Sequence, residues 1–114
     1  MVQSLLRVLL VSLVAVALFT FCASAARAQS AGEPLFKSKC AACHGPDGKG
    51  EVPMGKKLGA RNLASMEVQS QSDAQLVEVV TKGKNKMPSY DGKLKSDEIK
   101  GLVTYIRELA KKPS

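Results

Sequence analysis

Five consecutive residues, Cys40-Ala41-Ala42-Cys43-His44, could carry redox chemistry in this chain. Two cysteines separated by two residues and followed at once by histidine form the pattern to which haem is attached covalently. Each thiol can add to one vinyl group of the porphyrin, and one helical turn between the cysteines places both sulfurs along one edge of the ring. The histidine that follows can then bind the iron, so His44 is the predicted proximal ligand.

Two other kinds of site use a Cys-x-x-Cys pair. A structural zinc site needs four ligands, but outside the motif the chain has only Cys22 and no second histidine. A thioredoxin-type redox pair follows a buried strand, and no strand-like run of residues precedes Cys40. The pattern therefore favours covalent haem attachment over both alternatives.

The iron also needs a sixth ligand or an open position. With a single histidine, the soft ligand left is methionine. Met54 lies ten residues after His44, in a loop expected on the proximal side, and Met66 lies in a weakly predicted turn. Met87 lies in a later loop and is followed by Pro88, which stiffens the backbone. We predict Met87 as the distal ligand, with Met66, an open site and ordinary core packing of Met87 as alternatives.

Residues 1–28 resemble a secretory signal. Val8 to Phe21 form an almost unbroken apolar run, and Ala26-Arg27-Ala28 fits an A-x-A cleavage site before Gln29. Cleavage after Ala25 and retention as a membrane anchor are the alternatives, although the run is shorter than the ~20 residues of a spanning helix. Haem is attached to such motifs outside the cytoplasmic membrane, so the predicted location is the periplasm, with no stable membrane insertion after cleavage.

The remaining segment, residues 29–114, has the length of one small domain. A chain this short has a modest apolar core, and a covalently held haem would add a large apolar element to it. Removal of the signal takes Arg7 and Arg27 from 17 basic residues, which leaves 15 against 10 acidic ones, a net charge of +5. Lysines are spread along the chain without interleaved aromatics, so nucleic acid is not an expected partner.

The residue pattern predicts three main helices and no strands. The first spans about 31–43, and residues 45–63 form a loop broken by glycine and proline. Ser72-Asp73-Ala74-Gln75 forms a capping box that begins a helix to about Lys82, where Gly83 ends it. The last helix spans roughly 97–111 and carries an apolar stripe at helical spacing, made by Ile99, Leu102, Val103, Ile106, Leu109 and Ala110.

Over residues 29–114 the chain resembles the class I c-type cytochromes of the small monohaem bacterial kind. The matching haem and ligand positions are Cys40, Cys43, His44 and Met87. The resemblance implies an all-α class I cytochrome c fold, with three main helices and loops wrapped around one covalently attached haem c. It also implies that the first and last helices cross, through Gly32 and Phe36 on one and Leu102 and Tyr105 on the other.

Two further residues are predicted to serve the haem. The carbonyl of Pro53, nine residues after His44, is the candidate acceptor for the His44 Nδ1–H, as the resemblance also implies. Members of the family commonly pack a tryptophan against a haem propionate, and this chain has none. Tyr90 is the candidate for a propionate or ligand-loop contact instead.

The resemblance implies a soluble, monomeric one-electron carrier, not an enzyme, that shuttles electrons between redox proteins. Docking to acidic faces of those partners would use lysines around the haem edge, namely Lys37, Lys39, Lys84, Lys86, Lys93 and Lys95. One alternative is a haem-c subunit docked in an oxidoreductase complex. The other is an open-site haem enzyme or gas sensor.

Overall fold

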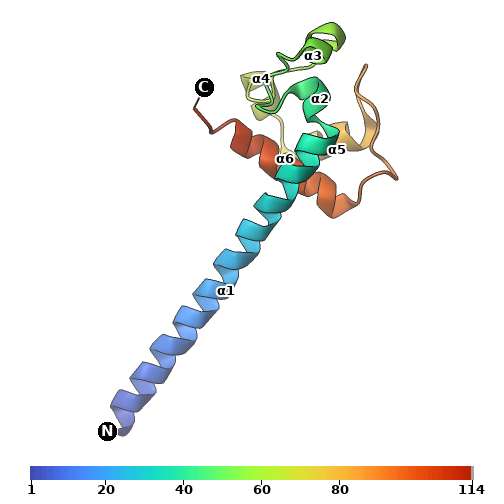
Figure 1. Cartoon of the computed structure of the whole chain (residues 1–114). Helices are drawn as coiled ribbons and strands as arrows, with labels where there is room; N and C mark the ends of the chain where they lie inside the picture. The colour runs from blue at the N-terminus through green and yellow to red at the C-terminus, as the bar shows by residue number, and fades with distance from the viewer. Residues whose placement is uncertain (114) are drawn as a thin grey trace.

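The computed structural model describes residues 1–113, with side chains for all of them except residues 17–30. Its helices are α1 (Val2–Lys39), α2 (Ala41–His44), α3 (Pro53–Leu58), α4 (Met66–Gln69), α5 (Asp73–Lys82) and α6 (Ser96–Leu109) (Figure 1). The only extended pairing among the described residues is an isolated bridge between Lys84 and Met87. The predicted all-α class is confirmed.

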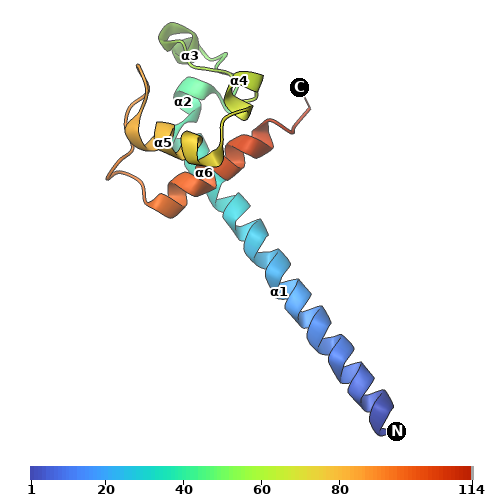
Figure 2. The same cartoon turned by 180° about the vertical axis from the view of Figure 1, so that it is seen from behind.

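Helix α1 is longer than the predicted first helix. It begins at Val2 instead of near residue 31, and it ends at Lys39, where a break at Cys40 separates it from α2. Figures 1 and 2 show its N-terminal part leaving the rest of the molecule as a straight rod. Among the described residues, no helix has the length and apolarity needed to cross a bilayer. Cys22 and the predicted cleavage site at 26–28 lie outside the residues whose side chains are described.

The C-terminal part of α1 crosses α6, as the resemblance implies (Figure 2). Gly32 allows the close approach, because a Cβ there would lie 2.3 Å from the carbonyl oxygen of Gly101. One turn further along, the rings of Phe36 and Tyr105 pack at a centroid distance of 5.3 Å and a tilt of 56°. Phe36 is fully buried and Leu102 is 1% exposed, so the crossing forms the centre of the core.

The middle of the chain differs from the predicted loop by one short helix, α3, which begins at Pro53 and ends at Gly59 in the left-handed conformation. Helix α5 agrees with its prediction. The Ser72 hydroxyl accepts from the Gln75 N–H at 3.2 Å, and the Gln75 side chain accepts from the Ser72 N–H at 2.8 Å. Leu76 and Val80 on α5 join α6 in the core, which leaves a hollow between these helices and α2.

Candidate haem site

The hollow is an open cavity of about 1320 Å³, counting its mouth, beside the crossing of α1 and α6. Its lining comes from the end of α1, α2, residues 58–71, α5, residues 84–90 and α6. The buried wall is apolar and includes Phe36, Leu63, Leu76, Val80, Leu102 and Ile106. Charged side chains lie only among its exposed lining residues, so the cavity suits a large apolar group with a polar edge.

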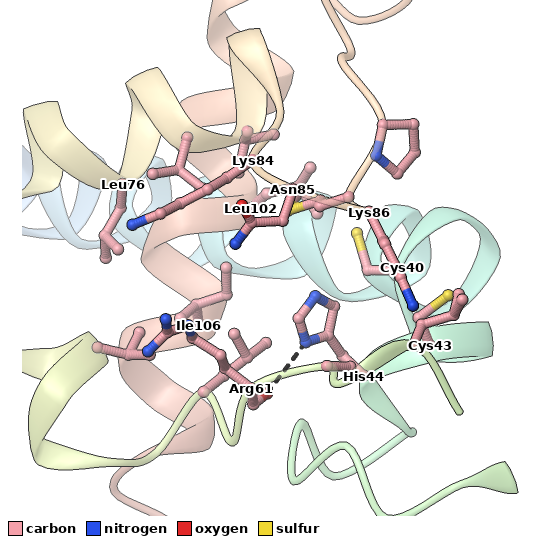
Figure 3. Close-up of a pocket in the computed structure, with 18 of the residues that line it drawn as sticks. Cys40, Cys43, His44, Arg61, Leu76, Lys84, Asn85, Lys86, Leu102 and Ile106 are labelled. Atoms are coloured by element: carbon pink, nitrogen blue, oxygen red, sulfur yellow. Dashed lines mark hydrogen bonds between the residues drawn. The ribbon is translucent and has the colours of Figure 1, made fainter. Parts of the chain in front are cut away.

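His44 lies at the end of α2 and lines this cavity (Figure 3). Its Nδ1 is 3.2 Å from the carbonyl oxygen of Arg61. A carbonyl can only accept, so this bond places the ring proton on Nδ1 and leaves the Nε2 lone pair free to bind a metal. Burial lowers the pKa of His44, and the bond to the Arg61 carbonyl opposes that shift only in part. The site therefore favours the neutral imidazole that ligation requires.

The predicted acceptor for this proton, the Pro53 carbonyl, is wrong. Pro53 begins α3, and carbonyls in the first turn of a helix point along its axis toward N–H groups four residues later. After α3 the chain turns at Gly59 and returns beside the haem motif, which brings Arg61 to His44. Spacing along the sequence does not reveal this return.

Both cysteines of the motif are half-buried in the cavity wall. Cys40 occupies the break between α1 and α2, where its N–H still bonds to the Phe36 carbonyl at 2.8 Å. Burial, assisted by the neighbouring Cys43, raises the pKa of Cys40 to about 11. The two thiols and His44 thus line one cavity, as covalent haem attachment demands.

Met87 also lines the cavity and packs against the core. The other two candidates do not line it, and their side chains face solvent: Met54 is 49% exposed and Met66 is 86% exposed. The backbone around Met87 is tightly held, because a Cβ at Gly83 would lie 2.6 Å from the Met87 carbonyl oxygen. Of the three candidate methionines, only Met87 lines the cavity that His44 lines.

Tyr90 lines the cavity as well, but its hydroxyl has a backbone partner. It donates to the Lys39 carbonyl at 3.0 Å, next to the first cysteine of the motif. The hydroxyl has one hydrogen, so it does not donate to a propionate while this bond is made, which corrects that part of the prediction. Burial raises the pKa of Tyr90, with a smaller effect from Cys40. Tyr90 thus ties the loop that carries Met87 to the end of α1.

Three of the six lysines predicted to serve in docking line the cavity, and three do not. Lys39, Lys84 and Lys86 line the cavity, whereas Lys37, Lys93 and Lys95 do not. Lys37 instead pairs with Glu33 at 2.8 Å on the outside of α1. Arg61, which is not among the predicted site residues, lines the cavity and forms an ion pair with Glu67. No local pattern marks Arg61, since its place depends on the return of the chain after α3.

Comparison with known proteins agrees with this site. Residues 27–106 match the family model described as "Cytochrome C oxidase, cbb3-type, subunit III". The chain belongs to this family of c-type cytochromes. It is 37% identical to cytochrome c6 of Nostoc sp. over 97 residues, which cover 82% of this chain and 85% of that protein. A solved structure, the KustC0563 c-type cytochrome, matches with a TM-score of 0.63 and 35% identity, over 68% of this chain and 95% of that one.

Other relatives are much longer. The chain is 34% identical over 80 residues to the cbb3-type cytochrome c oxidase subunit FixP of Bradyrhizobium diazoefficiens, a match that covers 68% of this chain. It spans only about a quarter of the length of that protein, 26%.

The family match, the cytochrome c6 relative and the solved c-type cytochrome together show that the chain is a small class I c-type cytochrome. It carries haem c, covalently bound.

Proposed function

We propose that this cytochrome is a soluble, monomeric one-electron carrier of the periplasm, with His44 and Met87 as the two axial ligands of the iron. Cys40 and Cys43 would hold the haem through thioether bonds. The observation that carries the proposal is that His44 and Met87 line the same cavity, whereas Met54 and Met66 do not. We base the periplasmic location on the signal-like segment 1–28 and on the export that haem attachment requires.

Haem supplies a one-electron couple, and the chain's own groups set how it would be used. The Arg61 carbonyl orients His44, and the backbone bridge between Lys84 and Met87 holds the other ligand residue. His44 and Met87 would both hold the iron from a packed domain, so little would need to rearrange when its charge changes. Methionine ligation favours the ferrous state and so raises the reduction potential. These features suit electron carriage better than substrate chemistry at the iron.

The test is the visible absorption spectrum of the oxidised holoprotein, made in a host that attaches haem c. A methionine sulfur on ferric haem gives a weak long-wavelength band. We expect this band in the unmodified protein and in Met66→Ala, and its loss in Met87→Ala. Met66→Ala is the matched control, since that side chain is 86% exposed. A high-spin spectrum with rapid binding of carbon monoxide on reduction would overturn the proposal in favour of an open site.

A second candidate function is that of a haem-c subunit within an oxidase complex. It is favoured by the description of the matching family and by the names of relatives such as the CcoP subunit of Azospirillum brasilense, 33% identical over 86 residues. Only 29% of that protein is covered by the match. Gentle purification from the native membrane and soluble fractions separates the two functions. A free carrier is recovered as a small soluble protein, and a subunit is recovered with its oxidase.

A further inference from the structure

Two cationic side chains lie at the end of the cavity away from the cysteines. In Figure 3, Arg61 and Lys84 extend toward Leu76 and Ile106, whereas Cys40 and Cys43 lie on the opposite side. Both cationic residues line the cavity. Lys86 extends the other way, toward Cys43.

The positions of the substituents on the haem ring explain why cations at this end of the cavity would be useful. The two vinyl groups that react with cysteines lie on one half of the ring, and the two propionate carboxylates lie on the other half. Attachment at Cys40 and Cys43 would therefore direct the carboxylates toward the end with Arg61 and Lys84. A carboxylate next to an apolar wall is costly unless a cation or hydrogen-bond donor meets it. We propose that Arg61 and Lys84 bind the two haem propionates, which extends the haem site of the proposed function.

The Arg61 guanidinium has N–H donors available to bind a propionate. One terminal nitrogen of its guanidinium pairs with Glu67, which leaves other N–H groups of the fork for a second carboxylate. The backbone around Arg61 is fixed. The N–H of Ala60 bonds to the Gly55 carbonyl at 2.8 Å, and the N–H of Leu63 bonds to the Gly48 carbonyl at 2.8 Å. The side chain therefore starts from a well-defined position at the cavity wall.

The backbone of Lys84 is also held in place by hydrogen bonds. Its side chain has no ion pair within the part of the chain that the structure describes. Its N–H bonds to the Met87 carbonyl at 3.2 Å, and the Met87 N–H bonds to its carbonyl at 2.9 Å. Each residue proposed to bind a propionate is thus hydrogen-bonded through its backbone to a residue proposed to bind the iron: Arg61 to His44, and Lys84 to Met87. Binding of the carboxylates would steady both segments that hold the iron.

The experiment uses the holoprotein with Arg61→Gln, Lys84→Gln and the double variant. These changes keep a polar side chain at both positions but remove the positive charges, and Arg61→Gln also removes the ion pair with Glu67. Arg61→Lys keeps the charge without the fork, and Lys57→Gln is the control, an exposed lysine that does not line the cavity. The readouts are the propionate bending band in the resonance Raman spectrum, which follows hydrogen bonding to the carboxylates, and the reduction potential.

We expect the propionate band to shift in each glutamine variant and most in the double variant. The reduction potential should fall in the same order, because a nearby cation favours the less positive ferrous state. Arg61→Lys should retain more of the potential than Arg61→Gln, and Lys57→Gln should match the unmodified protein. An unchanged propionate band in the folded double variant would overturn the proposal. The methionine band in the same samples reports the axial ligand separately, so that outcome would leave the proposed function intact.

Discussion

At the scale of single residues, the site depends on backbone carbonyls that meet side chains distant in sequence. Arg61 offers its carbonyl to His44, and Lys39 offers its carbonyl to the Tyr90 hydroxyl. Both bonds restrain segments that carry a proposed iron ligand. A carbonyl at the end of a helix lacks an intrahelical partner, so a hydroxyl that reaches it replaces a bond the helix cannot make.

Removal of the Tyr90 hydroxyl tests the second of these bonds. We expect Tyr90→Phe to lower the free energy of unfolding of the holoprotein by about 1 kcal/mol, the usual net contribution of such a bond. Tyr105→Phe is the control, because its ring packs on Phe36 and its hydroxyl makes no hydrogen bond with any described residue. Denaturant unfolding measures both variants. An equal loss in the two would show that the Tyr90–Lys39 bond contributes nothing specific.

At the scale of elements, α6 organises the domain. One face of it packs on α1 through Leu102 and Tyr105, and its other contacts reach the junction between α4 and α5. Arg107 makes the second connection. Its Nε donates to Asp73 at 3.0 Å, one terminal nitrogen donates to the Gln69 carbonyl at 3.0 Å, and the other donates to the Gln71 carbonyl. This junction includes cavity-lining residues, so Arg107 supports one wall of the haem site.

Truncation of Arg107 should therefore loosen that wall. We expect Arg107→Ala to lower the free energy of unfolding by about 2 kcal/mol, since it leaves backbone carbonyls without their charged donor. Arg107→Lys should recover only part of the loss, because an ammonium cannot reproduce the fork. Lys100→Ala, an exposed change on the same helix, is the control for helix propensity. Full recovery with lysine would assign the effect to charge alone.

At the scale of the whole molecule, positive charge gathers at the mouth of the haem site. The residues after the predicted signal carry a net charge of +5 from 15 basic and 10 acidic residues. Lys39 and Lys86 line the cavity and are not assigned to a propionate, and Lys86 extends toward Cys43 (Figure 3). Under the proposed function, such a local field would attract partners with acidic faces and speed their encounter.

Small oxidants of opposite charge measure this field directly. We expect the rate of oxidation by ferricyanide, an anion, to fall as ionic strength rises, and the rate with a cationic cobalt(III) complex to rise. Lys86→Gln should slow the ferricyanide reaction several-fold at low salt. Lys111→Gln, an exposed lysine that does not line the cavity, should change it little. The same salt dependence for both oxidants would contradict electrostatic steering at this site.

Features that depend on neighbouring residues could be predicted before the fold was known. Haem attachment needs two thiols and an imidazole in fixed order, and five adjacent residues supply them. The capping box of α5 closes within four residues. The crossing of the first and last helices was implied by the resemblance to the class I c-type cytochromes, and the close approach at Gly32 and the packing of Phe36 on Tyr105 confirm it.

Contacts between the haem motif and segments distant in sequence could not be predicted, because they depend on how the chain folds back. The carbonyl of Arg61, not that of Pro53, accepts the hydrogen bond from His44 Nδ1–H, because the chain turns back beside α2 after α3. Tyr90 bonds to Lys39, 51 residues away, instead of remaining free for a propionate. Three of the six lysines reach the cavity for the same reason. The order of residues in a motif and the hydrogen bonds within one helical turn depend on neighbouring residues. The hydrogen-bond partner of a carbonyl distant in sequence is fixed only when the whole chain packs.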